Sequence, residues 1–246
     1  MSLLGRVIRE VTPEEYTATI ALTSEPCADI GHLLRRALKP GDVFIDIGAK
    51  NGVATTLVGS AAVGPEGRVL ALEPDTGRFA RLLQNVSLNH AANTACIPVA
   101  ASDETIFATL FCEIPSGQSP RPGKSIRVQR VDDLCTKLGF KRVALVKIDA
   151  PGSELLVLRG MEKLLRRENA PEIICQISKW PARLVTTWRD GLLGYMADMG
   201  YEARPVGTTL VEQAPGKPAY VRFTLRFIKI QNPIDGNGID ASATRL

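Results

Sequence analysis

The order of apolar and polar segments along the chain predicts an α/β protein. Short, almost wholly apolar runs alternate with longer segments in which apolar residues recur every three or four positions. These patterns are typical of buried parallel strands and of amphipathic helices. Strands are expected at residues 43–47, 68–72, 96–100, 143–149, 173–177, 201–206 and 220–230. Helices are expected at 25–38, 53–62, 76–89, 132–139, 153–167 and 182–199. The alternation predicts a doubly wound, Rossmann-like and mostly parallel sheet of seven strands.

The alternation of strand and helix patterns is interrupted between residues 105 and 131. Two β-like runs, at 107–114 and 125–131, flank a loop rich in Ser, Gly, Pro and basic residues. We therefore expect an inserted hairpin. Its cations either attract an acidic acceptor or form a solvated basic loop, and they are Arg121, Lys124, Arg127 and Arg130.

The chain shows no repeat and no interior linker, so a single main domain is expected over residues 41–230. Residues 1–40 should form a helical lead-in packed on that core. Residues 231–246 contain few large apolar side chains and several Pro, Gly, Asn and Asp. That composition predicts a mobile tail.

Composition narrows the protein class only moderately. The 246 residues are 45% hydrophobic and 23% charged, which excludes disorder for most of the chain. A formal charge of +4 is too small and too dispersed for a dedicated nucleic-acid binder. No apolar stretch reaches the ~18 residues of a membrane span, and the first residues lack the pattern of a signal peptide, so a cytoplasmic location is expected. Five scattered cysteines favour buried thiols over disulfides or a zinc site.

Acidic residues mark the ends of the expected parallel strands. Asp46, Glu73 and Asp149 end three apolar runs, and Asp103 lies just past a fourth. Ligands of open parallel sheets bind outside the carboxyl ends of the strands. These carboxylates are therefore candidates for a binding site, although they could also serve only as caps of the strands.

The first strand is followed by a glycine turn with the pattern Asp46-x-Gly48-x-x-x-Gly52. Glycines permit a tight strand-to-helix turn and a close backbone approach to a ligand. The dinucleotide pattern G-x-G-x-x-G fails at its second glycine, and Asp46 would repel a pyrophosphate. A ligand with a positive sulfonium and no phosphate fits better. Asp46 can fix an amino acid moiety, and Glu73 can accept hydrogen bonds from two ribose hydroxyls, as S-adenosylmethionine would require.

Several blocks in a fixed order resemble the FkbM-type methyltransferases. They are GDVFIDIGAKNGVATTLVGSAAVGPEGRVLALEPD, LLQNVSLNH, VAASD, RVDDL and KIDAPGSELLVLRGMEKLL, within residues 41–176. The resemblance implies a class I fold, S-adenosylmethionine as cofactor, and methyl transfer to a hydroxyl oxygen of a small molecule, sugar or lipid. It implies that the methionine part lies against the glycine turn, the ribose against an acidic strand end, and the adenine near the third strand. The cofactor-binding residues expected in that order are Asp46, Gly48, Asn51, Gly52, Glu73, Ser102 and Asp103.

The chain departs from the family pattern at three positions. Lys50 occupies the position at which the family usually has Asn, and the amide side chain comes one residue later, at Asn51. Pro151 replaces a Glu, and Gln176 replaces a Glu that often ends the fifth strand. The two losses remove negative charge from the expected acceptor side. Hard divalent cations need several oxygen ligands, so we expect a reaction without a bound metal.

Asp149 is the candidate base for the acceptor hydroxyl, because it ends the fourth strand. Lys147 shares its face of the strand and is either a tuner, an alternative base, or simply an ion-pair partner of Asp149. His90 is a further candidate base, because histidine is the side chain best suited to proton transfer near neutral pH, but it follows Asn89 at a helix end where a cation is favourable in any case. Asn85 and Asn89 match the family, and packing or capping explains them equally well.

The leading prediction is therefore an S-adenosylmethionine-dependent O-methyltransferase whose partner is a small-molecule or glycan acceptor, with no nucleic acid and with the oligomeric state open. A cofactor-binding relative without catalysis is the alternative suggested by Pro151 and Gln176. A nicotinamide-dependent oxidoreductase rests only on the shared α/β architecture.

Overall fold

The computed structural model describes residues 8–11, 17–20, 30–110, 123–178, 185–211 and 220–230. The helices are α1 (Ile30–Ala37), α2 (Thr56–Val63), α3 (Thr76–Leu88), α4 (Val131–Lys137), α5 (Glu154–Arg159), α6 (Glu162–Leu165) and α7 (Val185–Asp198). The strands are β1 (Ile8–Val11), β2 (Thr17–Ile20), β3 (Val43–Ile47), β4 (Arg68–Leu72), β5 (Thr94–Ile97), β6 (Val99–Ala101), β7 (Ile106–Leu110), β8 (Lys124–Gln129), β9 (Leu145–Ile148), β10 (Glu172–Ser178), β11 (Tyr201–Val211) and β12 (Tyr220–Lys229).

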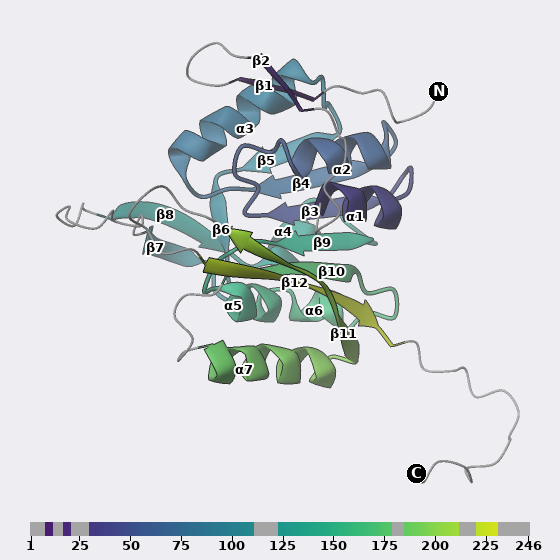
Figure 1. The fold of residues 1–246 in the computed structure, drawn as a ribbon, viewed down its shortest axis with the longest axis vertical. Coiled ribbons are helices and arrows are strands. Elements are labelled where there is room, and N and C mark those ends of the chain that lie inside the picture. Colours follow the sequence, from purple (N-terminus) through teal and green to yellow (C-terminus); the bar gives the residue numbers. More distant parts are fainter. Residues whose placement is uncertain are drawn as a thin grey trace, which may run out of the picture.

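A seven-stranded sheet with the order β11-β12-β10-β9-β3-β4-β5 forms the centre of the fold, as predicted (Figure 1). In this sheet β12 is antiparallel to both of its neighbours, β10 and β11, and the other pairs of adjacent strands are parallel. The chain first builds outward from β3 through β4 to β5 and then crosses to β9 on the other side of β3. This reversal makes the carboxyl ends of β3 and β9 the switch point at which ligands of such sheets bind.

Alternating side chains of the parallel strands build a separate apolar layer on each face of the sheet. On β3, Ile45 and Ile47 join the larger core cluster, which also contains side chains from α4 to α7. Phe44 joins the second cluster, with side chains from α1 and α2. Asp46 shares the face of Phe44 and is also buried. The alternation therefore carries a charged residue into the sheet interior beside α2.

The β run expected at 96–100 is two strands with different partners. Pro98, which has no backbone N–H to donate, separates β5 from β6. β5 is the edge strand of the main sheet, whereas β6 pairs with β8 in a three-stranded sheet of order β6-β8-β7. β7 and β8 pair antiparallel, as the hairpin prediction requires. The expected loop of the hairpin lies largely outside the described residues.

The single helix expected at 153–167 is also divided in two. Gly160 lies between α5 and α6, and a Cβ atom there would meet the carbonyl oxygen of Ser102 at 1.9 Å. The carboxylate of Asp132 accepts the backbone N–H groups of Lys163 (2.9 Å) and Leu164 (3.0 Å). Close packing and this side-chain cap therefore end one helix and begin another.

The N-terminal lead-in contains strands as well as the expected helix. β1 and β2 form a two-stranded antiparallel sheet that lies beside α3 (Figure 1). The helix expected at 25–38 is described from Ile30 onward as α1. The expected tail at 231–246 lies outside the described residues. None of the described helices is long and apolar enough to cross a membrane.

Candidate active site

The turn after β3 adopts three left-handed backbone conformations. Gly48, Lys50 and Gly52 have φ angles of +72°, +56° and +80°. A Cβ atom on Gly48 would lie 2.1 Å from the carbonyl oxygen of Asp149, and one on Gly52 would lie 2.4 Å from Cδ1 of Leu82. The two glycines thus allow the turn to press against the end of β9 and against α3, which explains their place in the sequence.

A fully buried ion pair, named the inner pair below, lies under this turn. Oδ1 of Asp46 is 3.0 Å from Nζ of Lys147, and the two side chains are 0% and 2% exposed. The other oxygen of Asp46 accepts the hydroxyl groups of Thr55 (2.5 Å) and Thr56 (2.6 Å). Nζ of Lys147 also donates to the carbonyl oxygen of Gly48 at 2.8 Å. The inner pair therefore holds the glycine turn from below.

A second lysine and aspartate, the outer pair, lie at the same end of the sheet. Nζ of Lys50 is 2.5 Å from Oδ2 of Asp149. The side chain of Lys50 is 40% exposed, whereas that of Asp149 is 2% exposed. Lys147 thus pairs with Asp46, and the pairing of Lys147 with Asp149 considered from the sequence is not the one the structure shows.

Glu73, at the end of β4, is tied to the same turn. Its Oε2 accepts the backbone N–H of Lys50 at 2.8 Å, and its Oε1 accepts the backbone N–H of Asp75 at 2.9 Å. Each carboxylate oxygen can accept a further hydrogen bond. Lys50 therefore connects two predicted site residues, through its backbone to Glu73 and through its side chain to Asp149.

The asparagines act on the turn through the backbone. The side chain of Asn51 accepts the N–H of Val53 at 3.3 Å. Buried Asn85 donates from its side chain to the carbonyl oxygen of Asn51 at 2.9 Å, and Asn89 donates to the carbonyl oxygen of Asn85 at 2.8 Å. Packing and capping, the second interpretation of Asn85 and Asn89, agree with these contacts.

Ser102 and Asp103 follow β6, which lies close to β4. The hydroxyl group of Ser102 donates to Oδ1 of Asp103 at 3.1 Å. The backbone oxygen of Asp103 accepts Nη1 of Arg130 at 2.6 Å. Both residues are half-buried at the base of the inserted hairpin. Their place at the end of β6 agrees with the predicted order of the site, and contact with an adenine stays a prediction.

The sequence did not single out Glu154, the first residue of α5. It is fully buried, and neither carboxylate oxygen has a hydrogen-bond partner among the described residues. Burial, with a smaller contribution from nearby Asp149, raises the pKa of Glu154 to about 8. Cys175 of β10 is buried close to Glu154, because burial and then the charge of Glu154 raise the pKa of that thiol. A protonated carboxyl therefore lies beside the outer pair at neutral pH.

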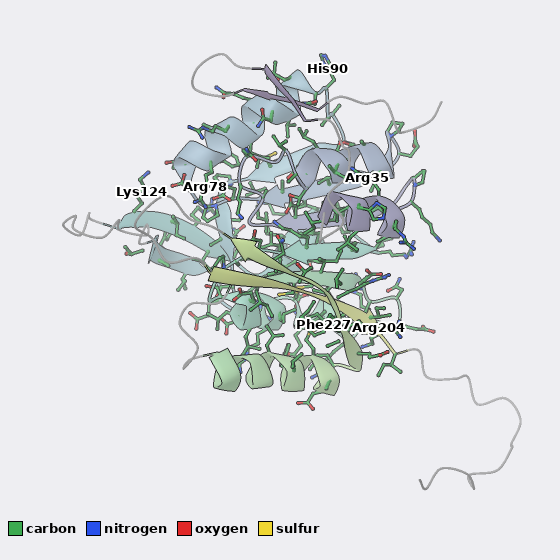
Figure 2. The ribbon with its side chains drawn as sticks, in the orientation of Figure 1. Arg35, Arg78, His90, Lys124, Arg204 and Phe227 are labelled. Carbon is green, nitrogen blue, oxygen red and sulfur yellow. The ribbon has the colours of Figure 1, made fainter. Side chains whose placement is uncertain are left out.

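His90 lies away from this site. It is exposed and follows the C-terminal end of α3 in a left-handed conformation (φ +52°). Figure 2 shows it at the opposite end of α3 from Arg78, which lies in the first turn of that helix, near Lys124. Of the two interpretations of His90, the role at the helix end agrees with this position.

The structure gathers Asp46, Gly48, Glu73, Lys147 and Asp149 around one turn, as predicted. Sequence reasoning missed Thr55, Thr56 and Glu154, and it treated Lys50 only as a departure from a pattern. Two consecutive polar residues shortly after the glycine turn were the feature of the sequence that could have indicated Thr55 and Thr56. No group of three or more His, Cys, Asp or Glu side chains in the described ranges could hold a metal ion.

The fold and the acidic strand ends are those of a class I methyltransferase. A profile described as the methyltransferase FkbM domain matches residues 46–203, nearly two thirds of the chain. The protein therefore belongs to the FkbM methyltransferase family, and its cofactor is S-adenosylmethionine. No curated protein sequence matches the chain. The family match leaves the nicotinamide alternative without support.

Several solved structures resemble this chain at low sequence identity, and the first of them shares its fold. Precorrin-6y C5,15-methyltransferase from Geobacter metallireducens is 16% identical, with a TM-score of 0.52 over 91% of this chain and 97% of that one. Methyltransferase FkbM from Methylobacillus flagellatus is 21% identical, with a TM-score of 0.45 over 78% of this chain and 50% of that one. Aeropyrum pernix fibrillarin with bound S-adenosyl-L-methionine is 17% identical, with a TM-score of 0.48 over 80% and 73%.

Proposed function

We propose that this methyltransferase acts on a hydroxyl oxygen of a small molecule, sugar or lipid. The observation that carries the proposal is the position of Asp149. Its carboxylate ends β9 at the switch point of the sheet, directly against the glycine turn and one lysine away from Glu73. A carboxylate at this position can accept the proton of an acceptor hydroxyl.

The residues present suit S-adenosylmethionine. Glu73 is fixed by two backbone N–H groups and keeps lone pairs for the two hydroxyls of a ribose. The turn carries no cluster of cations for a pyrophosphate. The cofactor supplies a methyl group activated by a sulfonium sulfur. Asp46 shapes the turn through the inner pair and the two threonines, and its direct contact with the cofactor stays a prediction.

Of the two candidate bases, Asp149 fits the role better than Lys147. The ammonium of Lys147 is buried, faces Asp46, and donates to the carbonyl oxygen of Gly48. An ammonium held in this way has no lone pair with which to take a proton. We therefore assign Lys147 to positioning the turn and Asp149 to the proton.

Calorimetric titration with S-adenosylmethionine and S-adenosylhomocysteine tests the cofactor site. Glu73→Gln keeps the shape of the side chain but removes its charge, so we expect affinity to fall by roughly tenfold to a hundredfold, since a hydrogen bond to a charged group is worth about 1.5–3 kcal/mol. Glu202→Gln, an exposed exchange on β11, is the matched control and should bind as the parent does. Equal binding by the Glu73 variant would remove Glu73 from the site.

Turnover of methyl-labelled S-adenosylmethionine with a panel of hydroxyl acceptors tests the reaction. Asp149→Asn should lower kcat by about 10²- to 10⁴-fold if the carboxylate is the general base. Affinity for S-adenosylhomocysteine should change little in this variant. A product methylated on nitrogen or carbon would contradict the O-directed proposal.

The second candidate function is a cofactor-binding protein without catalysis, favoured by Pro151 and Gln176. Gln176 is buried within β10 opposite Thr224 of β12, two residues before the strand ends at Ser178, so a neutral amide occupies this position. Gain of turnover by the double variant Pro151→Glu and Gln176→Glu over an inert parent would support it. Robust turnover by the parent would reject it.

A further inference from the structure

Cations and carboxylates at the switch point differ in their access to solvent. Asp46, Glu73 and Asp149 are at most 4% exposed. Lys50 is 40% exposed and Lys124, at the loop end of the hairpin, is 56% exposed. Lys124 belongs to this end of the sheet, because its Nζ is 3.3 Å from the hydroxyl group of Thr76, the first residue of α3. A molecule that approaches from solvent therefore meets these two ammonium groups before the three buried carboxylates.

The ammonium of Lys50 is held at this position by the backbone. The residue adopts a left-handed conformation that is unfavourable for any residue with a Cβ atom, and its N–H donates to Glu73. Nζ carries three donors, and within the described part of the chain its one ion-pair partner is Asp149. The remaining donors lie on a side chain that is not covered.

The charges beneath Lys50 largely cancel one another. Lys147 neutralises Asp46 in the inner pair. Glu154 is buried, its oxygens have no hydrogen-bond partner among the described residues, and its raised pKa keeps it largely protonated at neutral pH. Asp149 has Lys50 itself. The cluster therefore carries one uncompensated charge, that of buried Glu73, whose oxygens accept the backbone N–H groups of Lys50 and Asp75.

We propose that Lys50 binds a carboxylate or phosphate group of the acceptor, so that the substrate is an anionic hydroxyl compound. The inference rests on the proposed function, because it names the acceptor class for that site. An ammonium on a flexible stem is a common partner of anionic oxygens. An anion that shares Lys50 also weakens the hold of the ammonium on Asp149, which leaves that carboxylate more available to the neighbouring hydroxyl. Binding of the correct acceptor would thus release the base.

Anion titration of the full chain tests this proposal without knowledge of the acceptor. Sodium phosphate and sodium acetate are added at constant ionic strength to protein saturated with S-adenosylhomocysteine, and NMR signals of labelled lysine Cε groups report binding. We expect saturable binding of at least one anion with a shift of the Lys50 signal. Phosphate alone would indicate a phosphorylated acceptor, and acetate as well would indicate a carboxylate.

Three variants show whether the anion binds at Lys50 or elsewhere at this end of the sheet. Lys50→Met should weaken anion binding at least tenfold, and Asp149→Asn should strengthen it several-fold, because the competing carboxylate loses its charge. Lys124→Met, the matched control at the same end of the sheet, should bind as the parent does. No saturable binding, equal binding by Lys50→Met, or an equal loss in Lys124→Met would overturn the proposal.

A failure of the proposal for Lys50 can be distinguished from a failure of the proposed function. Calorimetry with S-adenosylhomocysteine on the parent and on Lys50→Met comes first. If the cofactor fails to bind, the proposed function falls, and the same anion titration on protein without cofactor still tests Lys50. If the cofactor binds and the anions do not, only the acceptor class is wrong.

Discussion

The inner and outer pairs place the same two residue types at the same end of the sheet in opposite environments. Lys147 and Asp46 lie 3.0 Å apart and are almost wholly buried. Lys50 and Asp149 lie 2.5 Å apart, with the ammonium 40% exposed. Both pairs join β9 or its end to β3 or the turn that follows it. Because the two pairs consist of the same residue types, the difference in burial of their lysines distinguishes their roles.

Burial decides what each pair can do. A buried pair stabilises a fold little compared with apolar residues, but removal of one partner leaves an isolated charge in the interior. A pair with an exposed partner exchanges with water and ions, and contributes between about 0 and 1 kcal/mol. The inner pair is therefore suited to holding the turn, and the outer pair to opening when a substrate arrives.

The largest expected effect is the loss of the inner pair. Lys147→Met leaves Asp46 charged and buried, and its remaining partners among the described residues are two hydroxyl groups. We expect the free energy of unfolding to fall by about 3–5 kcal/mol, as for other broken buried pairs. Urea denaturation at pH 7 measures it. The double variant Asp46→Asn and Lys147→Met should recover part of the loss, and a loss below about 1 kcal/mol in the single variant would contradict the distinction between the pairs.

Glu154 sharpens the comparison, because it is a buried carboxyl that forms no ion pair with any described residue. Its pKa lies near 8 in the folded protein against an ordinary value of 4.5, so between these pH values the folded state binds more protons than the unfolded state. Stability from this group is therefore full below pH 4.5 and is lost as the pH rises toward 8.

Glu154→Gln should remove that pH dependence. At about 1.4 kcal/mol per pKa unit, the variant should gain roughly 2–4 kcal/mol over the parent at pH 8 and little at pH 5. Denaturation curves at both pH values measure the difference. The control is Glu168→Gln, an exposed exchange. An equal effect at both pH values would show that the carboxyl is not protonated in the fold.

Most of the main sheet could be predicted, because its strands are short apolar runs between turn residues. β3 and β4 begin and end where the pattern places them. The division at Pro98 and the break at Gly160 depend on partners far away in the sequence, namely β8 and Ser102. Spacing along one segment contains no information about such partners.

The same limit applies to the candidate site, where contacts between distant segments could not be predicted. The carboxylates at the strand ends could be found, because parallel strands bring their carboxyl ends to one edge. Which lysine pairs with which aspartate could not, because Lys50 meets Asp149 only when a left-handed turn of β3 lies against the end of β9. Glu154 was missed because a glutamate at the start of a helix normally faces solvent and the helix dipole explains it.

The smallest expected effect comes from Lys50, where two contributions to stability can be separated. Lys50→Met removes the outer pair but keeps a Cβ atom at a φ of +56°. The ammonium that is lost is 40% exposed, so water can replace it at Asp149, and the free energy of unfolding should fall by less than in Lys147→Met. Lys50→Gly removes the pair and also the left-handed strain, and should be more stable than the methionine variant by about 1 kcal/mol. Parallel urea curves measure both. A methionine variant as unstable as Lys147→Met would show that the outer pair also acts as a structural lock, and the role proposed for Lys50 at an open mouth of the site would then be lost.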